Sequence, residues 1–285
     1  ELRDFQTKVI NQALLKKDIL VISPTSSGKS LCFQLPALIN DGISVVISPL
    51  RSLIYDQVSK LKEKNINAHY LSSDITKDNK IALFNKLDVN TLNEPLLLYT
   101  TPETIINNSE FIDKVNNFYE KNKFNFIIID EAHCVSTWGH DFRPNYLKLK
   151  YIRNEFPNTP IMALTASATE KVKMDITEIL NMKNYETIQK SFLRDNLVIK
   201  IRDKNKNTFF KIEESLKSHY KNKSGIIYCS SRNKCEELYE KLNSCGISAY
   251  FYHAGLTKKL REEIQKKWID NKINVIIATI AFGMG

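Results

Sequence analysis

Short apolar runs rich in Ile, Val and Leu recur between residues 19 and 164, and longer stretches with helical spacing of apolar residues separate them. Near-continuous apolar strands that alternate with helices predict a parallel sheet covered by helices on both faces. The expected strands are Ile19–Ser23, Ser44–Ser48, Pro95–Thr100, Phe126–Asp130 and Pro160–Leu164. The expected helices are Lys29–Asn40, Leu53–Lys64, Thr76–Leu87 and Thr169–Leu180.

The pattern pauses in a polar stretch at Ser191–Asn196 and then restarts. We therefore expect two α/β domains, residues 1–190 and 191–285. In the second domain the expected strands are Leu197–Ile201, Gly225–Cys229, Ser248–Tyr252 and Asn274–Thr279, and the expected helices are Asn207–Tyr220, Arg232–Cys245 and Thr257–Ile269. A doubly wound domain rarely stops directly after a strand, so we expect the second domain to be truncated.

A candidate phosphate-binding loop follows the first strand and opens a helix, with the sequence SPTSSGKS from Ser23 to Ser30. In this context successive backbone N–H groups and the helix N-terminus bind phosphate oxygens. Lys29 would reach the β- and γ-phosphates, and the Ser30 hydroxyl would be a ligand of Mg²⁺. Ser23 stands where the first glycine is usual. The expected nucleotide-binding residues of this loop are Thr25, Ser26, Ser27, Gly28, Lys29 and Ser30.

A pair of carboxylates follows the apolar run Phe126–Ile129. Asp130 at the end of a parallel strand is placed to hold Mg²⁺ beside the phosphate loop. The adjacent Glu131 is a candidate general base for the attacking water. Together with Lys29, these residues predict an ATP-hydrolysing site, and the alternative of a simple acidic turn loses most of its weight.

Composition changes this picture little. The net charge of +9 suits a nucleic-acid partner, although heavy use of Lys throughout the chain supplies much of it. Five cysteines without a Cys-x-x-Cys pair argue against a zinc cluster and favour reduced, intracellular thiols that act as small core residues. The apolar runs are too short to span a bilayer, and the first residues, Glu1–Asp4, do not look like a signal peptide.

With these motifs the chain resembles the DEAH-type superfamily 2 helicases and, within them, the RecQ family. Its first residues look like the family's adenine-recognition motif, which implies that Arg3 stacks on the base and Gln6 pairs with it. The segments Ser48–Leu53 and Tyr99–Glu103 look like motifs that touch the backbone of the tracked strand, and we assign that contact to Ser48 and Thr101. Thr165–Thr169 resembles the motif that links ATP state to domain movement.

The most family-specific run is His133–Pro144, which is similar to the aromatic-rich loop of RecQ enzymes. The resemblance implies that Trp138 and Phe142 stack on unpaired bases and that Arg143 meets a phosphate or stacks. Because the loop continues from the acidic motif through His133, binding of a nucleic-acid base to the loop can influence the ATP site. The alternative is that the two aromatic residues belong to the core.

In the second domain, Gly225–Arg232 and Tyr252–Leu256 resemble motifs of the family's second motor domain, and Val275–Gly285 resembles the start of a further one. The family places an arginine finger, a zinc-binding module and a winged-helix module beyond this point, so zinc is expected only in that region. Ser167–Ile176, Ser191–Arg194 and Trp268 look closer to the eukaryotic Bloom-syndrome-type branch.

These observations predict two RecA-like P-loop NTPase domains that use ATP and Mg²⁺. The expected function is an ATP-dependent DNA helicase of DNA repair and recombination, with single-stranded and duplex DNA as partners and no membrane association. Travel from 3′ to 5′ is implied by the resemblance alone. The expected location is the nucleus in a eukaryote and the cytoplasm otherwise. Two alternatives stay open, a DEAH-type RNA-dependent ATPase and a non-catalytic nucleic-acid-binding scaffold.

Overall fold

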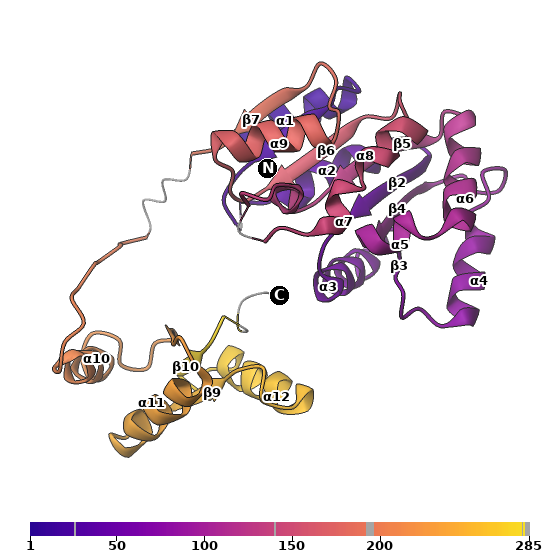
Figure 1. The fold of residues 1–285 in the computed structure, drawn as a ribbon. Coiled ribbons are helices and arrows are strands. Elements are labelled where there is room, and N and C mark those ends of the chain that lie inside the picture. The colour runs from indigo at the N-terminus through magenta and orange to yellow at the C-terminus, as the bar shows by residue number, and fades with distance from the viewer. Residues whose placement is uncertain (26, 140, 192–196, 281, 283–285) are drawn as a thin grey trace. The chain divides into compact units, whose positions relative to one another are not determined.

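The computed structural model describes residues 1–25, 27–139, 141–191, 197–280 and 282. The chain divides into two compact units, residues 1–194 and 195–285 (Figure 1). The sequence predicted the boundary between residues 190 and 191. Each unit is an α/β domain built on a parallel sheet, as the sequence pattern predicted.

The first unit is built on a parallel sheet with the order β3-β4-β2-β5-β6-β1-β7 among the described residues. Because all strands run the same way, their carboxyl ends meet at one edge of the sheet. The strand after which the phosphate loop comes, β1, is separated from β5 by β6 alone. The strands are β1 (Ile19–Ile22), β2 (Gly42–Ile47), β3 (Ala68–Leu71), β4 (Pro95–Thr100), β5 (Phe124–Ile129), β6 (Ile161–Thr165) and β7 (Glu186–Gln189).

Helices cover both faces of this sheet. Those on one face are α1 (Asp4–Leu14), α2 (Lys29–Ala37) and α3 (Arg51–Lys62). Those on the other are α4 (Lys77–Lys86), α5 (Pro102–Ile106), α6 (Ser109–Glu120), the 3₁₀ turn η1 (Ala132–Val135), α7 (Pro144–Leu147), α8 (Lys150–Glu155) and α9 (Glu170–Ile179). Neighbouring residues of one strand point to opposite faces: Val21 packs with α1–α3, whereas Ile22 packs with α4–α9. This double coverage explains why the strands read as continuous apolar runs.

The second unit has a parallel sheet with the order β8-β10-β9 among its described residues. Its core also lies on both sides of the sheet, with α10 and α11 on one face and α12 on the other. The elements are α10 (Thr208–Lys217), β8 (Gly225–Tyr228), α11 (Arg232–Ser244), β9 (Ala249–Tyr252), α12 (Lys258–Ile269) and β10 (Val275–Ala278).

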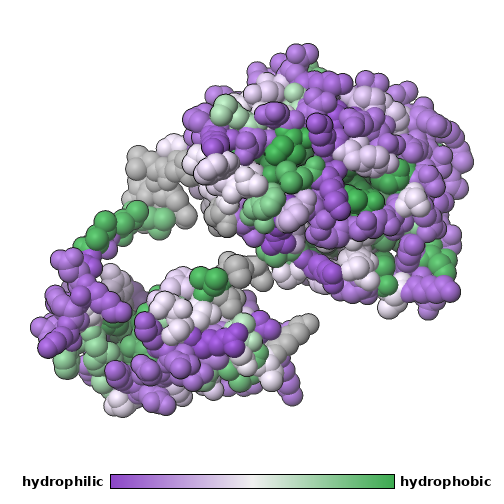
Figure 2. Space-filling model, viewed as in Figure 1, coloured by the Kyte–Doolittle hydropathy of each residue, from purple (hydrophilic) through white to green (hydrophobic). Residues whose placement is uncertain are grey.

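The predicted strand Leu197–Ile201 is wrong. These residues are extended without a paired neighbour among the described residues, and Val198, Ile199 and Ile201 are 80%, 87% and 94% exposed. They form the green run between the grey segment and α10 in Figure 2. A β-branched run favours extended backbone, but a strand also needs a neighbouring strand to bond its N–H and C=O groups.

A buried ion pair holds the opposite end of the first sheet, where β1 begins. The carboxylate of Asp18 accepts hydrogen bonds from Arg153 at 2.6 Å and from the backbone N–H groups of Ile161 and Lys183 at 2.7 and 2.6 Å. Arg153 also donates to the carbonyl of Thr159 at 2.9 Å. The Arg153 and Asp18 side chains are 3% and 5% exposed, so these bonds join β1 to the starts of β6 and β7 away from water.

We expect Asp18→Ala to lower the free energy of unfolding of the first unit by about 3–5 kcal/mol, because it leaves the Arg153 charge buried and unpaired. The matched control is Asp56→Ala, which breaks the exposed pair of Asp56 and Lys60 on α3 and costs about 0–1 kcal/mol. Urea unfolding followed by circular dichroism measures both changes. Equal destabilisation by the two variants would show that the buried pair does not hold this end of the sheet.

Candidate functional site

The candidate site lies at the carboxyl ends of three adjacent strands, β1, β6 and β5. The phosphate loop follows β1 at Ser23, Thr165 ends β6, and Asp130 follows β5. The sheet order therefore brings together three segments that the sequence keeps far apart. The backbone N–H of Ser23 donates to the Thr165 carbonyl at 3.1 Å, and that of Asp130 donates to the Ile47 carbonyl at 2.9 Å, so both segments continue the sheet.

The phosphate loop needs glycine at one described position. Gly28 has φ +90°, in the left-handed region, and an added Cβ would lie 2.5 Å from the Gln6 amide nitrogen. Ser23, Thr25 and Ser27 have no positive φ, so serine at the usual glycine positions causes no backbone strain there. Instead the Ser23 and Ser27 hydroxyl groups bond to each other at 2.8 Å. Ser26 lies outside the described residues.

Helix α1 is tied to the phosphate loop through Arg3 and Gln6. The Arg3 guanidinium donates to the Ser27 carbonyl at 2.7 Å, and the Gln6 amide donates to the Gly28 carbonyl at 3.1 Å. The side-chain oxygen Oε1 of Gln6 accepts from the backbone N–H of Arg3 at 2.9 Å, and Gln6 is 5% exposed. Both residues thus hold the loop, and adenine recognition by them stays a prediction.

The charged groups expected at the metal–phosphate site interact electrostatically. Asp130 is 7% exposed. Burial, and then the negative charge of Glu131, raises the pKa of Asp130 to about 7, while the Lys29 ammonium acts in the opposite direction. The same ammonium donates to the Ser23 carbonyl at 3.2 Å, so Lys29 lies over the loop. A divalent cation beside Asp130 would offset its burial, so Asp130 and the Ser30 hydroxyl fit a hard, oxygen-bound ion such as Mg²⁺.

Glu131 has an unusual backbone. Its φ of 49° and ψ of 46° place it in the left-handed region, which costs a residue with a side chain about 1–2 kcal/mol. Such strain is concentrated at functional sites. The turn directs the Glu131 carboxylate to within 3.2 Å of Nδ1 of His133. The half-buried Glu131 carboxylate therefore lies beside the His133 ring at the edge of the sheet.

His133 joins the acidic motif to the segment after β6. Its Nδ1 forms a 2.9 Å hydrogen bond with the hydroxyl of Thr165, and the ring is 5% exposed. The Thr165 hydroxyl in turn bonds to the backbone N–H and C=O of Ser167 at 3.2 and 3.1 Å. A continuous chain of short contacts thus runs from Glu131 through His133 and Thr165 to Ser167.

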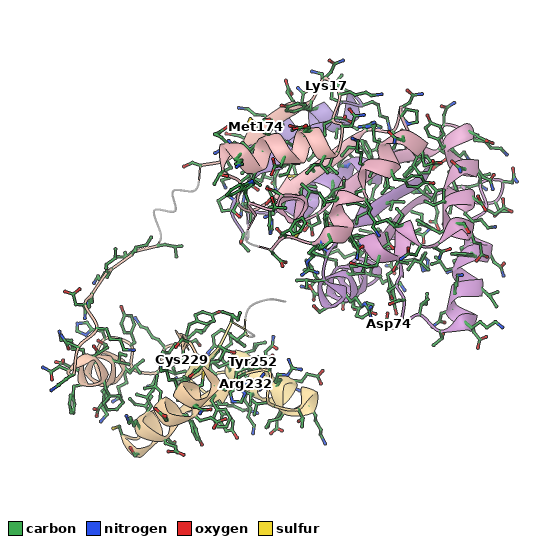
Figure 3. All side chains as sticks on the ribbon, in the orientation of Figure 1. Lys17, Asp74, Met174, Cys229, Arg232 and Tyr252 are labelled. Carbon is green, nitrogen blue, oxygen red and sulfur yellow. The ribbon has the colours of Figure 1, made fainter. Side chains whose placement is uncertain are left out.

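The aromatic-rich loop contacts α9 through Ser136 and Trp138. The Ser136 hydroxyl donates to the Asp175 carboxylate and accepts from the backbone N–H of Trp138 at 3.1 Å. The Lys171 ammonium lies 3.3 Å from the centre of the Trp138 ring, a cation–π contact. Figure 3 labels Met174 on the same helix. Trp138 is 66% exposed and therefore is not a core aromatic residue.

A groove of about 420 Å³ lies beside Trp138 and is lined also by His133, Ser167, Thr169 and Val172. The groove thus touches the aromatic-rich loop, the acidic motif and the start of α9 together. A group that enters it would contact His133 and Ser167, two members of the chain of contacts described above, whereas Glu131 does not line the groove.

The other two predicted residues of this loop differ from Trp138. Phe142 is half-buried. The Arg143 guanidinium donates to the carbonyl of Pro49 at 2.7 Å and to the carboxylate of Asp141 at 3.0 and 3.2 Å. Arg143 therefore joins the loop to the segment before α3, and its contact with a DNA phosphate stays a prediction.

Ser48 and Thr101 do not present their hydroxyl groups at the surface. Ser48 is 0% exposed, and its Oγ has no hydrogen-bond partner among the described residues. Thr101 is 5% exposed and caps α5 by accepting from the backbone N–H of Thr104. In this conformation a strand that passes over these segments would meet their neighbours rather than the two hydroxyl groups.

In the second unit the segments that resemble family motifs lie at the carboxyl ends of β8 and β9. Figure 3 labels Cys229 and Arg232, which follow β8, and Tyr252, which ends β9. The next residue, His253, is 4% exposed, donates from Nε2 to the Glu236 carboxylate at 2.9 Å, and accepts at Nδ1 from the backbone N–H of Gly255 at 3.2 Å. These bonds order the turn after β9.

The remaining chemistry is sparse in the described part of the chain. No group of three His, Cys, Asp or Glu side chains in it is arranged to hold a metal, and no helix in it is long and apolar enough to cross a membrane. All five cysteines are free, and burial raises the pKa of Cys32 and Cys235 to about 11 and of Cys134 to about 12. These thiols are therefore poor nucleophiles.

Three contributors to the site were not singled out from the sequence. The Tyr146 hydroxyl donates to the Asp130 carbonyl at 3.1 Å, Thr165 bonds His133, and Lys171 covers Trp138. Thr165 had a usable signal, because it ends an apolar strand within a recognised motif. Lys171 had none, since it is one lysine among many in this chain.

The chain matches the family model described as DEAD/DEAH box helicase over residues 3–175 and the model described as helicase conserved C-terminal domain over residues 207–285. Solved structures similar to it include the DUF1998 helicase MrfA bound to DNA and AMPPNP, with a TM-score of 0.71 at 18% identity, covering 100% of this chain and 42% of that one. At that identity the likeness shows the fold alone.

Curated relatives are more similar in sequence. The ATP-dependent helicase SGS1 of Saccharomyces cerevisiae is 44% identical over 99% of this chain and 20% of its own length. The RecQ-like DNA helicase BLM of Xenopus laevis is 44% identical over 99% and 21%, and the ATP-dependent DNA helicase RecQ of Haemophilus influenzae is 44% identical over 99% and 44%. The chain thus spans less than half the length of these relatives. Because all three are 44% identical to it, sequence identity does not assign the chain to the eukaryotic or the bacterial relatives.

Proposed function

The chain belongs to the RecQ family of DEAD/DEAH-box helicases, and on this premise we propose that it forms the motor core of an ATP-dependent DNA helicase. The observation that carries the proposal is the path from the acidic motif to the exposed Trp138. Glu131 contacts His133, His133 bonds Thr165, and the groove beside Trp138 is lined by His133 and by the residues after Thr165. A site for ATP and a site for an unpaired base would therefore be connected through His133.

ATP with Mg²⁺ would supply the phosphoanhydride bond whose hydrolysis drives movement. The phosphate loop would bind the phosphates through backbone N–H groups at the start of α2, where the helix dipole favours negative charge. Lys29 would neutralise phosphate charge, and Ser30 and Asp130 would hold Mg²⁺. Arg3 and Gln6 fix the carbonyl groups of Ser27 and Gly28 and so keep the loop in one conformation.

Glu131 would accept a proton from the attacking water. Its left-handed backbone and its contact with His133 limit the positions of the carboxylate. A base that enters the groove beside Trp138 would displace or shift the side chains that line it, and His133 is one of them. Base occupancy would thereby alter the position of Glu131 and the rate of hydrolysis. His133 would therefore position the Glu131 carboxylate and would not itself transfer a proton.

We propose that the nucleic-acid partner is single-stranded DNA and that the motor opens duplex DNA, in DNA repair and recombination. The similarity to relatives that are named DNA helicases supports this substrate. Travel from 3′ to 5′ rests on the family resemblance. The relatives come from eukaryotes and bacteria, so the proposed location is the nucleus in a eukaryotic cell and the cytoplasm in a bacterial one.

We expect Trp138→Ala to uncouple DNA binding from ATP hydrolysis. One stacked base is worth about 1–3 kcal/mol, and other segments also contact the strand, so affinity for single-stranded DNA should stay within about tenfold of the wild type. The stimulation of ATP hydrolysis by DNA should fall much further, because the groove beside His133 loses its aromatic wall. Fluorescence anisotropy and steady-state ATP hydrolysis measure the two quantities.

Tyr185→Ala is the control for this experiment, since Tyr185 is also exposed in the first unit but lies outside the groove. It should change neither quantity. If Trp138→Ala lowers binding and stimulation by the same factor, Trp138 is an ordinary binding residue. A large fall in melting temperature would show that it supports the fold instead.

A further inference from the structure

A second pocket, lined by both polar and apolar side chains, among them Ile75 and Leu83, lies at the far edge of the first sheet. It has a volume of about 260 Å³ and opens between the edge strand β3 and α4. In the sheet order β4, β2, β5 and β6 separate β3 from β1, so this pocket is not part of the phosphate loop site. Figure 3 labels Asp74 in the segment that joins β3 to α4. The polar lining consists chiefly of Lys62, His69, Asn79 and Lys86.

The charged side chains that line this pocket are all positive. Lys62 at the end of α3 and Lys86 at the end of α4 line it, and no Asp or Glu does. Neither lysine forms an ion pair with a described carboxylate, although Lys60 pairs with Asp56 and Lys80 pairs with Glu110. Asp74 is the acidic residue beside β3, and it accepts hydrogen bonds from the hydroxyl groups of Tyr55 and Ser72.

His69 lines the pocket together with the two lysines. Burial lowers the pKa of its ring to about 4, and the positive charges of Lys86 and Lys62 act in the same direction. The half-buried ring is therefore neutral at pH 7 and offers an N–H donor without adding charge. Two lysines, one histidine and one asparagine, from three different elements, thus line one small volume.

We propose that this pocket binds a phosphoryl anion through Lys62 and Lys86, with His69 and Asn79 as neutral donors. Several donors from different directions match the several oxygens of a tetrahedral phosphoryl group. A free phosphate takes the volume of two or three waters, roughly 60–90 Å³. The pocket is larger than that, so it also admits a phosphoryl group attached to a sugar. The two possible sources are the backbone of a nucleic acid and free phosphate.

The test is an NMR titration of the His69 ring, assigned with His69→Gln, in the absence of ATP and Mg²⁺. Inorganic phosphate is added in one series and a short single-stranded oligonucleotide in another. A bound anion favours the charged ring, so saturation should raise the pKa of His69 by about one unit or more, which corresponds to tenfold tighter binding to the protonated form. The ligand that acts at the lower concentration of phosphoryl groups is the source.

The double variant Lys62→Gln with Lys86→Gln should raise the pKa of His69 without ligand and weaken anion binding about tenfold or more. Lys64→Gln is the matched control, because Lys64 is exposed in the same segment but does not line the pocket. It should leave both quantities unchanged. The double variant and Lys64→Gln should hydrolyse ATP at the wild-type rate, so the result does not depend on the proposed motor activity.

The proposal is overturned if neither phosphate nor the oligonucleotide moves the His69 resonance. It is also overturned if the double variant binds the anion as well as the wild type does. Equal weakening by Lys64→Gln would show general attraction to a positive surface and would overturn it too.

Discussion

Lys29→Ala is expected to lower ATP hydrolysis by the protein at least about 10²-fold, the scale on which one fixed donor to a developing charge acts. The Lys29 ammonium is the cation that the loop presents, and it also reduces the pKa-raising effects on Asp130. The side chain is half-buried and donates to a backbone carbonyl, so its removal should leave the fold intact. Steady-state ATP hydrolysis and thermal melting measure the two effects.

Lys8→Ala is the control for this loss, because Lys8 is an exposed lysine on α1 and its removal changes the net charge equally. It should hydrolyse ATP at the wild-type rate. Hydrolysis near the wild-type rate in Lys29→Ala would show that the segment Ser23–Ser30 is not the phosphate site.

Glu131→Gln is expected to lower the hydrolysis rate about 10²–10⁴-fold while nucleotide binding is retained. The amide keeps the shape of the side chain and its reach towards His133 but cannot accept the proton of the attacking water. Binding of a fluorescent ATP analogue and single-turnover hydrolysis separate the two steps. Glu178→Gln, on the exposed side of α9, is the control and should change neither.

Two other outcomes for Glu131→Gln would each change its role. A parallel loss of binding and hydrolysis would indicate that Glu131 helps to hold the metal ion. An unchanged hydrolysis rate would place the general base elsewhere.

The parts of the fold that follow from local sequence were predictable. β1, β2, β4, β5 and β6 are buried on both faces, so each is predominantly apolar. The edge strands were missed because their environment is mixed. β3 and β7 are partly exposed and contain polar residues, so their sequences resemble loops. Conversely, Leu197–Ile201 has the composition of a strand but no partner among the described residues.

The candidate site divides in the same way. The phosphate loop and the acidic pair are short segments whose chemistry is contained in their own residues. The contacts that connect them depend on distant parts of the chain, such as Thr165 with His133, 32 residues apart, and Arg143 with Pro49, 94 residues apart. Which of Ser48, Trp138 and Arg143 is exposed is likewise a property of packing, and residue type alone does not determine it.

ATP hydrolysis in the presence of matched nucleic acids distinguishes a motor driven by DNA from one driven by RNA. The rate is measured with no nucleic acid, with a single-stranded DNA, and with an RNA of the same base sequence, at one salt concentration because phosphate contacts weaken with salt. We expect strong stimulation by the DNA and much weaker stimulation by the RNA. Stimulation by the RNA that equals or exceeds that by the DNA would contradict this expectation and favour an RNA-dependent ATPase.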